Sequence, residues 1–423
     1  MSSFEALGLT SEILSAINKI GYTTPTPIQN QAIPPILKGK DILGVAQTGT
    51  GKTAAFSLPI LNHLQTNAKK VVKGKSRVLI LTPTRELATQ IDQNIKEYST
   101  NFKIKTKVIF GGVSHRPQVE AISKGLDIII ATPGRLLELI NDGYLTFDFL
   151  DLFVLDEADR MLDMGFIRDI KKIMATLPEK KQTLLFSATM PNEIANLASG
   201  LLHDPVRVEV TPQSTTVEKI KQSVHTVPKT HKPLLLKTIL KDRRIKSVLV
   251  FTRTKHGANR VVKHLENANI KSAAIHGNKS QTARENALNN FRQEKIRVLV
   301  ATDIAARGID VDHIGHVINY DIPNDPENYV HRIGRTGRAG REGVALSFCD
   351  ETELNYLKSI EKLIKLKIPK EEQIKLDLTQ LNTGNNQRPS NTGRPGNSSH
   401  RSKKPTQRNK NNRRQRPQKP KAK

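Results

Sequence analysis

The sequence predicts an α/β protein of two tandem domains, each with a mostly parallel sheet flanked by helices, followed by a disordered basic tail. Short runs rich in β-branched residues end in polar loops, and helical patterns follow them. This alternation is typical of buried parallel strands in an α/β sheet. A polar stretch with turn chemistry at 211–216 separates two such sets. From Thr379 onward, 13 of the 67 lysines and arginines occur with no aspartate or glutamate and few apolar residues to offset the entropy of ordering.

The predicted strands follow in chain order. The first set is 41–46, 78–82, 107–110, 127–131, 152–155 and 183–186, and the second set is 247–251, 272–275, 297–301, 315–320 and 343–348. After 78–82, a helix is expected over 85–98, because its apolar residues recur on one face. We therefore expect one domain at 1–210, a linker at 211–217, a second domain at 218–378 and the tail at 379–423.

Composition limits the classes of function. The 423 residues include 67 Lys and Arg against 40 Asp and Glu, a net charge of +27 that favours a polyanionic partner. The single cysteine, Cys349, cannot form an intrachain disulfide or a Cys-rich zinc site, and His225 and His231 lack partner ligands. The start lacks a signal-peptide pattern and no apolar run reaches the ~18–20 residues of a membrane span. A cytoplasmic location is expected.

The segment 46–53 has the pattern of a phosphate-binding loop. It reads Ala-Gln-Thr-Gly-Thr-Gly-Lys-Thr and stands between a strand and the apolar helical stretch 54–64. Such loops wrap their backbone around phosphates, while Lys52 would reach the β- and γ-phosphates and Thr53 would ligate Mg²⁺. Ala46 departs from the usual first glycine, and a flexible turn with a solvated lysine is the alternative. The expected ATP contacts are Gln47, Thr48, Gly49, Thr50, Gly51, Lys52 and Thr53.

Acidic residues follow another predicted strand directly. The apolar run 152–155 leads into Asp156, Glu157 and Asp159. Beside a phosphate-binding loop, Asp156 would organise Mg²⁺, largely through water, and Glu157 would polarise the attacking water. Taken alone, the cluster could equally be a solvated loop or a helix cap.

The segment 331–338 in the second domain, His-Arg-Ile-Gly-Arg-Thr-Gly-Arg, can supply positive charge to a γ-phosphate. Arg335 and Arg338 are expected on one side of a helical turn, and His331 begins the segment. The alternative is a basic loop that faces RNA or solvent. If the arginines complete the ATP site, catalysis depends on closure of the two domains.

Together these motifs resemble the DEAD-box RNA helicases of superfamily 2, and residues 156–159 spell the family name. The resemblance covers about 4–370 and implies two RecA-like domains that use ATP and Mg²⁺. The segment 21–29 resembles the family's Q motif, which implies that Gln29 reads the adenine edge and that Phe4, upstream, stacks on the base. The family's phosphate loop begins with alanine, so Ala46 is the expected form.

Further segments match the family in its order. The resemblance implies RNA-backbone contacts at Pro83, Thr84, Arg85, Gly112, Thr132, Pro133 and Arg135, and in the second domain at Arg253, Arg284 and Thr302. It also implies that Ser187 and Thr189, with Asp159, couple ATP to RNA, and that Asp310 touches the ribose. Singly, such short motifs are as often helix starts or turns. With 4% aromatic residues, backbone contacts rather than a stacking platform are expected.

The resulting hypothesis is an ATP-dependent RNA helicase that unwinds or remodels short duplexes locally and non-processively, in ribosome assembly or RNA turnover, with ribosomal or RNA-decay proteins as partners. Residues 4–9 and 159–166, with the short basic tail, resemble the bacterial RhlE group. Eukaryotic and nuclear members share the core, and 413–416 could belong to a nuclear signal. The rival functions are an RNA annealer driven by the tail and a DNA-dependent motor.

Overall fold

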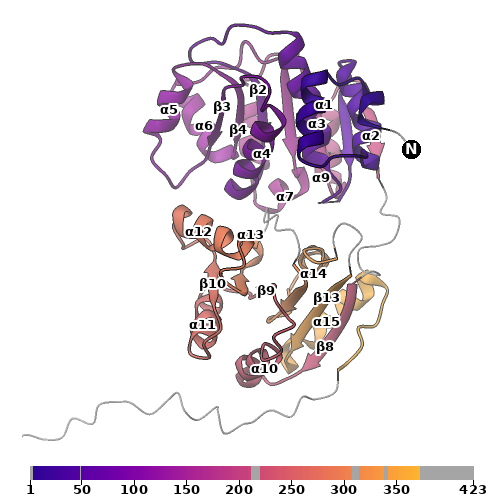
Figure 1. Cartoon of the computed structure of the whole chain (residues 1–423), viewed down its shortest axis with the longest axis vertical. Coiled ribbons are helices and arrows are strands. Elements are labelled where there is room, and N and C mark those ends of the chain that lie inside the picture. The colour runs from indigo at the N-terminus through magenta and orange to yellow at the C-terminus, as the bar shows by residue number, and fades with distance from the viewer. Residues whose placement is uncertain (1–2, 48, 211–219, 307–313, 338–341, 372–423) are drawn as a thin grey trace, which may run out of the picture. The chain divides into compact units, whose positions relative to one another are not determined.

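The structure, a computed structural model, describes residues 3–47, 49–210, 220–306, 314–337 and 342–371. Within these residues the strands form two sheets, and every strand pair is parallel. We call residues 3–210 the first lobe and residues 220–371 the second lobe, and describe each by itself (Figure 1). The predicted fold class is confirmed for both lobes, whereas the predicted linker and tail lie outside the described residues.

The first lobe contains a seven-stranded sheet with the order β3-β4-β2-β5-β6-β1-β7. Its strands are β1 (Ile42–Val45), β2 (Ser76–Leu81), β3 (Thr106–Ile109), β4 (Leu126–Ala131), β5 (Leu152–Asp156), β6 (Gln182–Ser187) and β7 (Val206–Glu209). Its helices are η1 (Phe4–Leu7), α1 (Ser11–Lys19), α2 (Pro27–Leu37), α3 (Lys52–Thr66), α4 (Arg85–Tyr98), α5 (Arg116–Ile122), α6 (Pro133–Asn141), α7 (Ala158–Asp163), α8 (Ile167–Met174) and α9 (Asn192–Leu201).

Both faces of this sheet are buried. In β2, Val78 and Ile80 pack with α1 to α4, while Leu79 and Leu81 pack with the later helices of the lobe. Successive side chains of a strand point to opposite faces, so a strand covered on both sides needs an unbroken apolar run. This is why Val-Leu-Ile-Leu could be recognised as a strand in the sequence.

The second lobe contains a six-stranded sheet with the order β10-β11-β9-β12-β13-β8. Its strands are β8 (Ile220–Thr226), β9 (Val248–Phe251), β10 (Ser272–Ile275), β11 (Val298–Ala301), β12 (His316–Asn319) and β13 (Gly343–Cys349). Its helices are η2 (Lys229–His231), α10 (Lys232–Ile239), α11 (Lys255–Glu266), α12 (Gln281–Arg292), α13 (Asp303–Ala306), α14 (Pro326–Ile333), η3 (Glu351–Glu353) and α15 (Leu354–Ile364). In Figure 1, α10, α11 and α12 label the helices around β9 and β10.

In a parallel sheet all strands end at the same edge, and ligands bind where the loops leave that edge. In the first lobe this carboxyl edge carries the loops after β1, β2, β3, β4, β5 and β6. In the second lobe it carries the loops after β9, β11 and β12. The predicted functional residues follow these strands, so the topology gathers residues that are far apart in the sequence.

Candidate nucleotide and RNA site

The phosphate-binding loop joins the end of β1 to the start of α3. Gly49 and Gly51 have φ angles of 85° and 95°, which non-glycine residues rarely adopt. A Cβ atom on Gly51 would also lie 2.5 Å from Nε2 of Gln29. Lys52 is 6% exposed and its Nζ donates to the carbonyl of Ala46 at 2.8 Å. The ammonium group is therefore held inside the loop, where a phosphate would approach.

Gln29 lies against this loop, as the resemblance to the Q motif implied. Its Oε1 accepts from the backbone N–H of Thr26 at 2.9 Å, and its Nε2 donates to the carbonyl of Gly51 at 3.2 Å. The first contact is half of a capping box at the start of α2. Gln29 thus ties the helix start to the phosphate loop, and its contact with adenine stays a prediction.

Phe4 lies buried beside Tyr22, and its stacking on the adenine base stays a prediction. Its side chain is 3% exposed, and its ring stacks on Tyr22 with a centroid distance of 6.1 Å. Tyr22 is partly exposed, and its hydroxyl hydrogen-bonds that of Tyr98 at 3.0 Å. Of these rings, Tyr22 is the one that is partly exposed. The sequence analysis did not single it out, although it follows Gly21 within the Q motif.

The acidic residues stand at the carboxyl end of β5. Asp156 is its last residue and is 2% exposed, and its Oδ1 makes no hydrogen bond in the described part of the chain. Burial raises the pKa of Asp156 to about 7, against the opposing effect of nearby Lys52 and with a further increase from Glu157. A buried carboxylate oxygen without a hydrogen-bond partner in the described residues fits a bound cation.

Glu157 has an unusual backbone conformation. Its φ and ψ angles are 57° and 51°, the left-handed region, which costs free energy for a residue with a side chain. Its Oε2 accepts from Nη1 of Arg160 at 3.0 Å, and both side chains are buried. Arg160, which the sequence analysis overlooked, therefore fixes the carboxylate of the predicted base.

The predicted coupling residues are in direct contact. Oδ2 of Asp159 accepts from the N–H and the hydroxyl of Thr189 at 2.9 and 3.1 Å and from the N–H of Ala188 at 3.2 Å. Oγ of Ser187 accepts from the N–H of Asp159 at 3.2 Å and donates to the carbonyl of Thr189 at 2.8 Å. Because β5 and β6 are neighbours, the two segments meet where these strands end.

The predicted RNA contacts of the first lobe gather at the ends of β2, β3 and β4. The guanidinium group of Arg85 lies 5.8 Å from the centre of the Phe110 ring. A Cβ atom on Gly112 would lie 2.5 Å from the same guanidinium group. Arg135 donates to the carbonyl of Val113 at 3.3 Å and to Glu138 at 2.7 Å. Pro83 and Thr84 precede α4, and Thr132 and Pro133 begin α6. The structure brings these residues together, and their contact with RNA stays a prediction.

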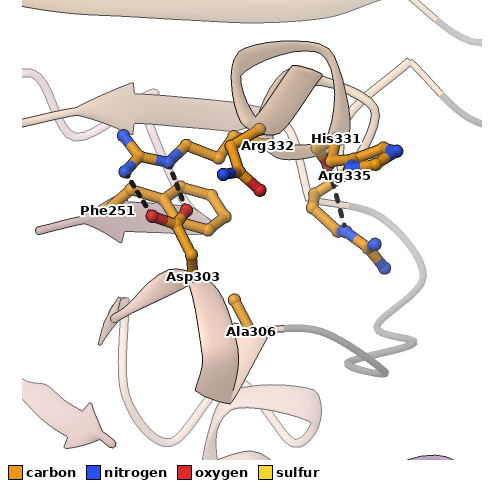
Figure 2. A pocket seen from close by; sticks show the side chains of 7 residues that line it. Phe251, Asp303, Ala306, His331, Arg332 and Arg335 are labelled. Carbon is orange, nitrogen blue, oxygen red and sulfur yellow. Dashed lines mark hydrogen bonds and ion pairs between the residues drawn. The ribbon is translucent and has the colours of Figure 1, made fainter. Parts of the chain in front are cut away.

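In the second lobe, a cavity between α13 and α14 is lined by Phe251, Asp303, Ala306, Asn328, His331, Arg332 and Arg335. Figure 2 shows Arg332 over the ring of Phe251, at 5.1 Å, with two hydrogen bonds to Asp303 of 2.5 and 2.8 Å. Arg335 is 4% exposed, and its Nε donates to the carbonyl of His331 at 3.3 Å (Figure 2).

Of the predicted helical turn at the arginine segment, the structure describes the part at Arg335. Helix α14 ends at Ile333, so Arg335 lies in the turn that follows it. The backbone N–H groups of Gly334 and Arg335 still bond to the last turn of the helix. Arg338 and Asp310 lie outside the described residues, as does Thr48 of the phosphate loop.

The other predicted contacts of the second lobe are separate from this cavity. Nη2 of Arg253 donates to Oε1 of Glu353 at 2.6 Å and to the carbonyl of Ile322 at 3.0 Å. Thr302 follows β11 and its carbonyl accepts from Ala305 and Ala306, while Arg284 lies in the first turn of α12. The side chain of Arg253 is therefore already bound within its own lobe.

The described residues hold neither a metal-ligating cluster nor a membrane-spanning helix. No group of three or more His, Cys, Asp or Glu residues there is arranged to hold a metal ion. None of the helices in the same ranges is long and apolar enough to cross a membrane. His225 packs against Phe348 with a ring distance of 6.1 Å, and Cys349 is buried.

The phosphate loop, the acids at the strand end and the second parallel-sheet lobe define a nucleoside triphosphatase of two RecA-like lobes. Family models agree: residues 26–197 match the DEAD/DEAH box helicase domain, and residues 231–340 match the helicase conserved C-terminal domain. The chain belongs to the DEAD-box RNA helicase family. It is an ATP-dependent RNA helicase and RNA-dependent ATPase.

Relatives and solved structures give the same result. The ATP-dependent RNA helicase CshA of Listeria monocytogenes is 41% identical over 86% of this chain and 69% of its own length. RhpA of Helicobacter pylori is 41% identical over 86% of this chain and 73% of its own. The structure of S. cerevisiae Dbp5 bound to RNA and ADP BeF3 matches with a TM-score of 0.77 and 31% identity, over 88% of this chain and 96% of Dbp5.

Proposed function

We propose that the first lobe binds Mg²⁺–ATP and that residues of both lobes complete the hydrolytic site. Thr53, at the start of α3, and Asp156, with its unused buried oxygen, would hold the cation. The cation would neutralise charge on the β- and γ-phosphates. Lys52 would exchange the carbonyl of Ala46 for a phosphate oxygen, and Glu157 would orient the attacking water.

The second lobe would supply positive charge from the segment that follows α14. Arg335 is buried and its Nε is bound to the carbonyl of His331, so the turn itself fixes the direction of its side chain. Arg338 would act beside it. Because an arginine finger stabilises charge that develops in the transition state, hydrolysis would require the two lobes to close around ATP.

The proposed coupling of ATP hydrolysis to RNA unwinding is supported by the hydrogen bonds between Asp159 and the Ser187–Thr189 segment. Asp159 is two residues from the proposed base and accepts three hydrogen bonds from that segment. A change at the hydrolytic centre is therefore transmitted directly to the end of β6. On closure, RNA held along the strand ends would be bent, and a short duplex would lose base pairs locally.

Phosphate release from ATP tests the assignment, with the protein alone and with single-stranded RNA, a short RNA duplex or single-stranded DNA. Glu157→Gln is expected to retain ATP and RNA binding and to lose turnover. Arg335→Ala is expected to lose RNA-stimulated hydrolysis by ~10³-fold or more, because a finger acts only on the transition state. Normal turnover in Glu157→Gln would overturn the proposal, and equal stimulation by DNA would favour a DNA-dependent motor.

For the subgroup, we propose a CshA-like helicase. The predicted RhlE group is not supported, since the similar proteins carry the names CshA and RhpA. Of the two segments on which that prediction depended, residues 159–166 lie within the general DEAD/DEAH box match and residues 4–9 lie outside it. The domain limits, the cytoplasmic location and the ribosomal or RNA-decay partners stay predictions from the sequence.

A further inference from the structure

A second cavity lies in the first lobe at the opposite edge of the sheet from the ATP site. It has a volume of about 260 Å³ and lies where β2 and β5 begin, with Ser76, Arg77 and Asp151 in its wall. Asp156 stands at the other end of β5, so five residues, or about 16 Å, separate it from Asp151. No residue assigned to ATP, RNA or coupling lines this cavity.

The walls of the cavity carry more positive than negative charge. Lys69, Lys70, Lys75, Arg77 and Lys180 line it, against Asp148 and Asp151. Asp151 is paired with Arg77 at 2.7 Å and with Lys69 at 3.0 Å, and Asp148 is paired with Lys75 at 2.7 Å. Both carboxylates are thus neutralised within the wall.

Two cations of the wall remain available. Lys70 and Lys180 make neither an ion pair nor a side-chain hydrogen bond to any residue that the structure describes. Both are exposed, so no burial cost has to be offset before an anion binds. The cavity therefore presents two unused ammonium groups to a phosphate or a carboxylate.

An aromatic ring stands in the same wall. Phe149 is 52% exposed and lies between exposed Asp148 and buried Leu150. Nζ of Lys75 lies 4.4 Å from the centre of the ring, and Lys75 is itself fixed by Asp148. One face of the ring is therefore occupied by a cation that also restrains it, and the exposed fraction leaves area for a second planar group.

We propose that this cavity binds a nucleotide of single-stranded RNA, with the base on Phe149 and the adjoining phosphates at Lys70 and Lys180. A ring beside unpaired lysines is the combination by which proteins hold single strands without reading sequence. An acidic peptide would satisfy the lysines but would leave the half-exposed ring without a planar partner. RNA is also the polymer on which this protein acts.

The position of the site gives it a distinct role. It is built from one lobe alone, at the far end of β5 from the ATP chemistry. RNA held there would stay bound whether or not ATP is present. We expect such a contact to retain the RNA when ATP hydrolysis releases it from the carboxyl edge of the sheet.

Photo-cross-linking of the full-length protein to a single-stranded RNA that contains 5-iodouridine tests this proposal. The expected result is a cross-link in the peptide that contains Phe149, of equal yield with and without a non-hydrolysable ATP analogue. Phe149→Ala, and separately Lys70→Glu with Lys180→Glu, should lower that yield at least about fivefold. The matched control is Lys19→Glu with Lys171→Glu, two exposed lysines of the same lobe outside the cavity, which should leave the yield unchanged.

RNA-stimulated phosphate release at saturating RNA separates this proposal from the helicase assignment. It should persist in Phe149→Ala, because the ring is remote from the catalytic residues. Absence of the cross-link, or the same yield in all variants, would overturn the site. If added millimolar AMP abolishes the cross-link by competition, the cavity is instead a site for free nucleotides. Binding of a labelled polyglutamate peptide that depends on Lys70 and Lys180 but not on Phe149 would assign it to an acidic protein segment.

Discussion

At the scale of single residues, the catalytic carboxylate depends on a neighbour with no assigned chemistry. Glu157 is held in the left-handed region, and its side chain, 5% exposed, is paired with that of Arg160, 4% exposed. A buried ion pair contributes little net stability, but the loss of one member leaves a charge that is costly to bury. Arg160 is therefore expected to serve stability and the orientation of Glu157 together.

We predict that Arg160→Met lowers the free energy of unfolding by about 3 kcal/mol, because a buried carboxylate loses its guanidinium partner. This corresponds to a melting temperature about 6 to 12 °C lower, measurable by circular dichroism. Glu157→Gln should also lower the free energy of unfolding, because it leaves the buried guanidinium group of Arg160 without its carboxylate partner. The double variant Glu157→Gln with Arg160→Met should recover part of the loss, and strictly additive effects would contradict the coupling.

The residues whose chemistry is local were predictable from the sequence. Asp156 and Glu157 stand at the end of a buried strand, and Lys52 closes the glycine-rich loop that follows another, so their place at the sheet edge needed no further information. Tyr22 was missed because a ring inside a motif gives no sign of its exposure. The pairs Asp159 with Thr189 and Arg332 with Asp303 join residues about 30 apart, and their contact depends on strand order, which spacing does not encode.

At the scale of elements, a buried lysine joins three segments of the second lobe. Lys232, at the start of α10, is 0% exposed. Its Nζ lies 2.6 Å from Glu353 in η3, 3.3 Å from Asp350 and 3.8 Å from Asp321, after β12. Glu353 in turn accepts from Arg253, which follows β9. One buried ammonium group thus lies among three carboxylates, of which Glu353 also binds the guanidinium group of Arg253.

Lys232→Met is expected to destabilise the second lobe by about 3 to 5 kcal/mol, because it leaves three acids around an apolar side chain. Urea unfolding followed by circular dichroism measures the loss. Adding Glu353→Gln should restore part of it by removing one of those charges. Lys241→Met, at an exposed lysine beyond the same helix, is the control and should unfold at the wild-type midpoint. A midpoint unchanged in Lys232→Met would show that the cluster is solvated.

The central strands could be predicted from the sequence, whereas two edge strands could not. In β7 only Val208 is buried, and its neighbours Arg207 and Glu209 face solvent. Strand β8 contains the polar run Lys221-Gln222-Ser223, and on its outer edge Val224 exchanges backbone hydrogen bonds with Pro369 and Glu371 from far along the chain. Edge strands are stabilised by one neighbour and one buried face, so they lack the continuous apolar run that marks a central strand.

At the scale of the whole molecule, positive charge is concentrated beyond the helicase core. Residues 379–423 carry 13 lysines and arginines and no acid, out of a net charge of +27 for the chain. The composition alone predicts a sequence-independent attraction to RNA phosphates, because binding releases condensed counterions. We therefore expect the core to contribute ATP-dependent RNA contacts and the tail to contribute affinity that does not depend on ATP.

Truncation after Leu381 is expected to weaken RNA binding at low salt and to make its salt dependence shallower. Each phosphate of a single strand that the protein neutralises contributes about 0.7 to the magnitude of the slope of log affinity against log salt, so loss of three or more contacts makes the slope shallower by at least about 2. Fluorescence anisotropy with labelled RNA over a salt series measures this, while phosphate release at saturating RNA should stay at the full-length value. An unchanged slope would confine RNA binding to the lobes. Loss of strand annealing with retained ATPase would instead make the tail an annealing module attached to a helicase.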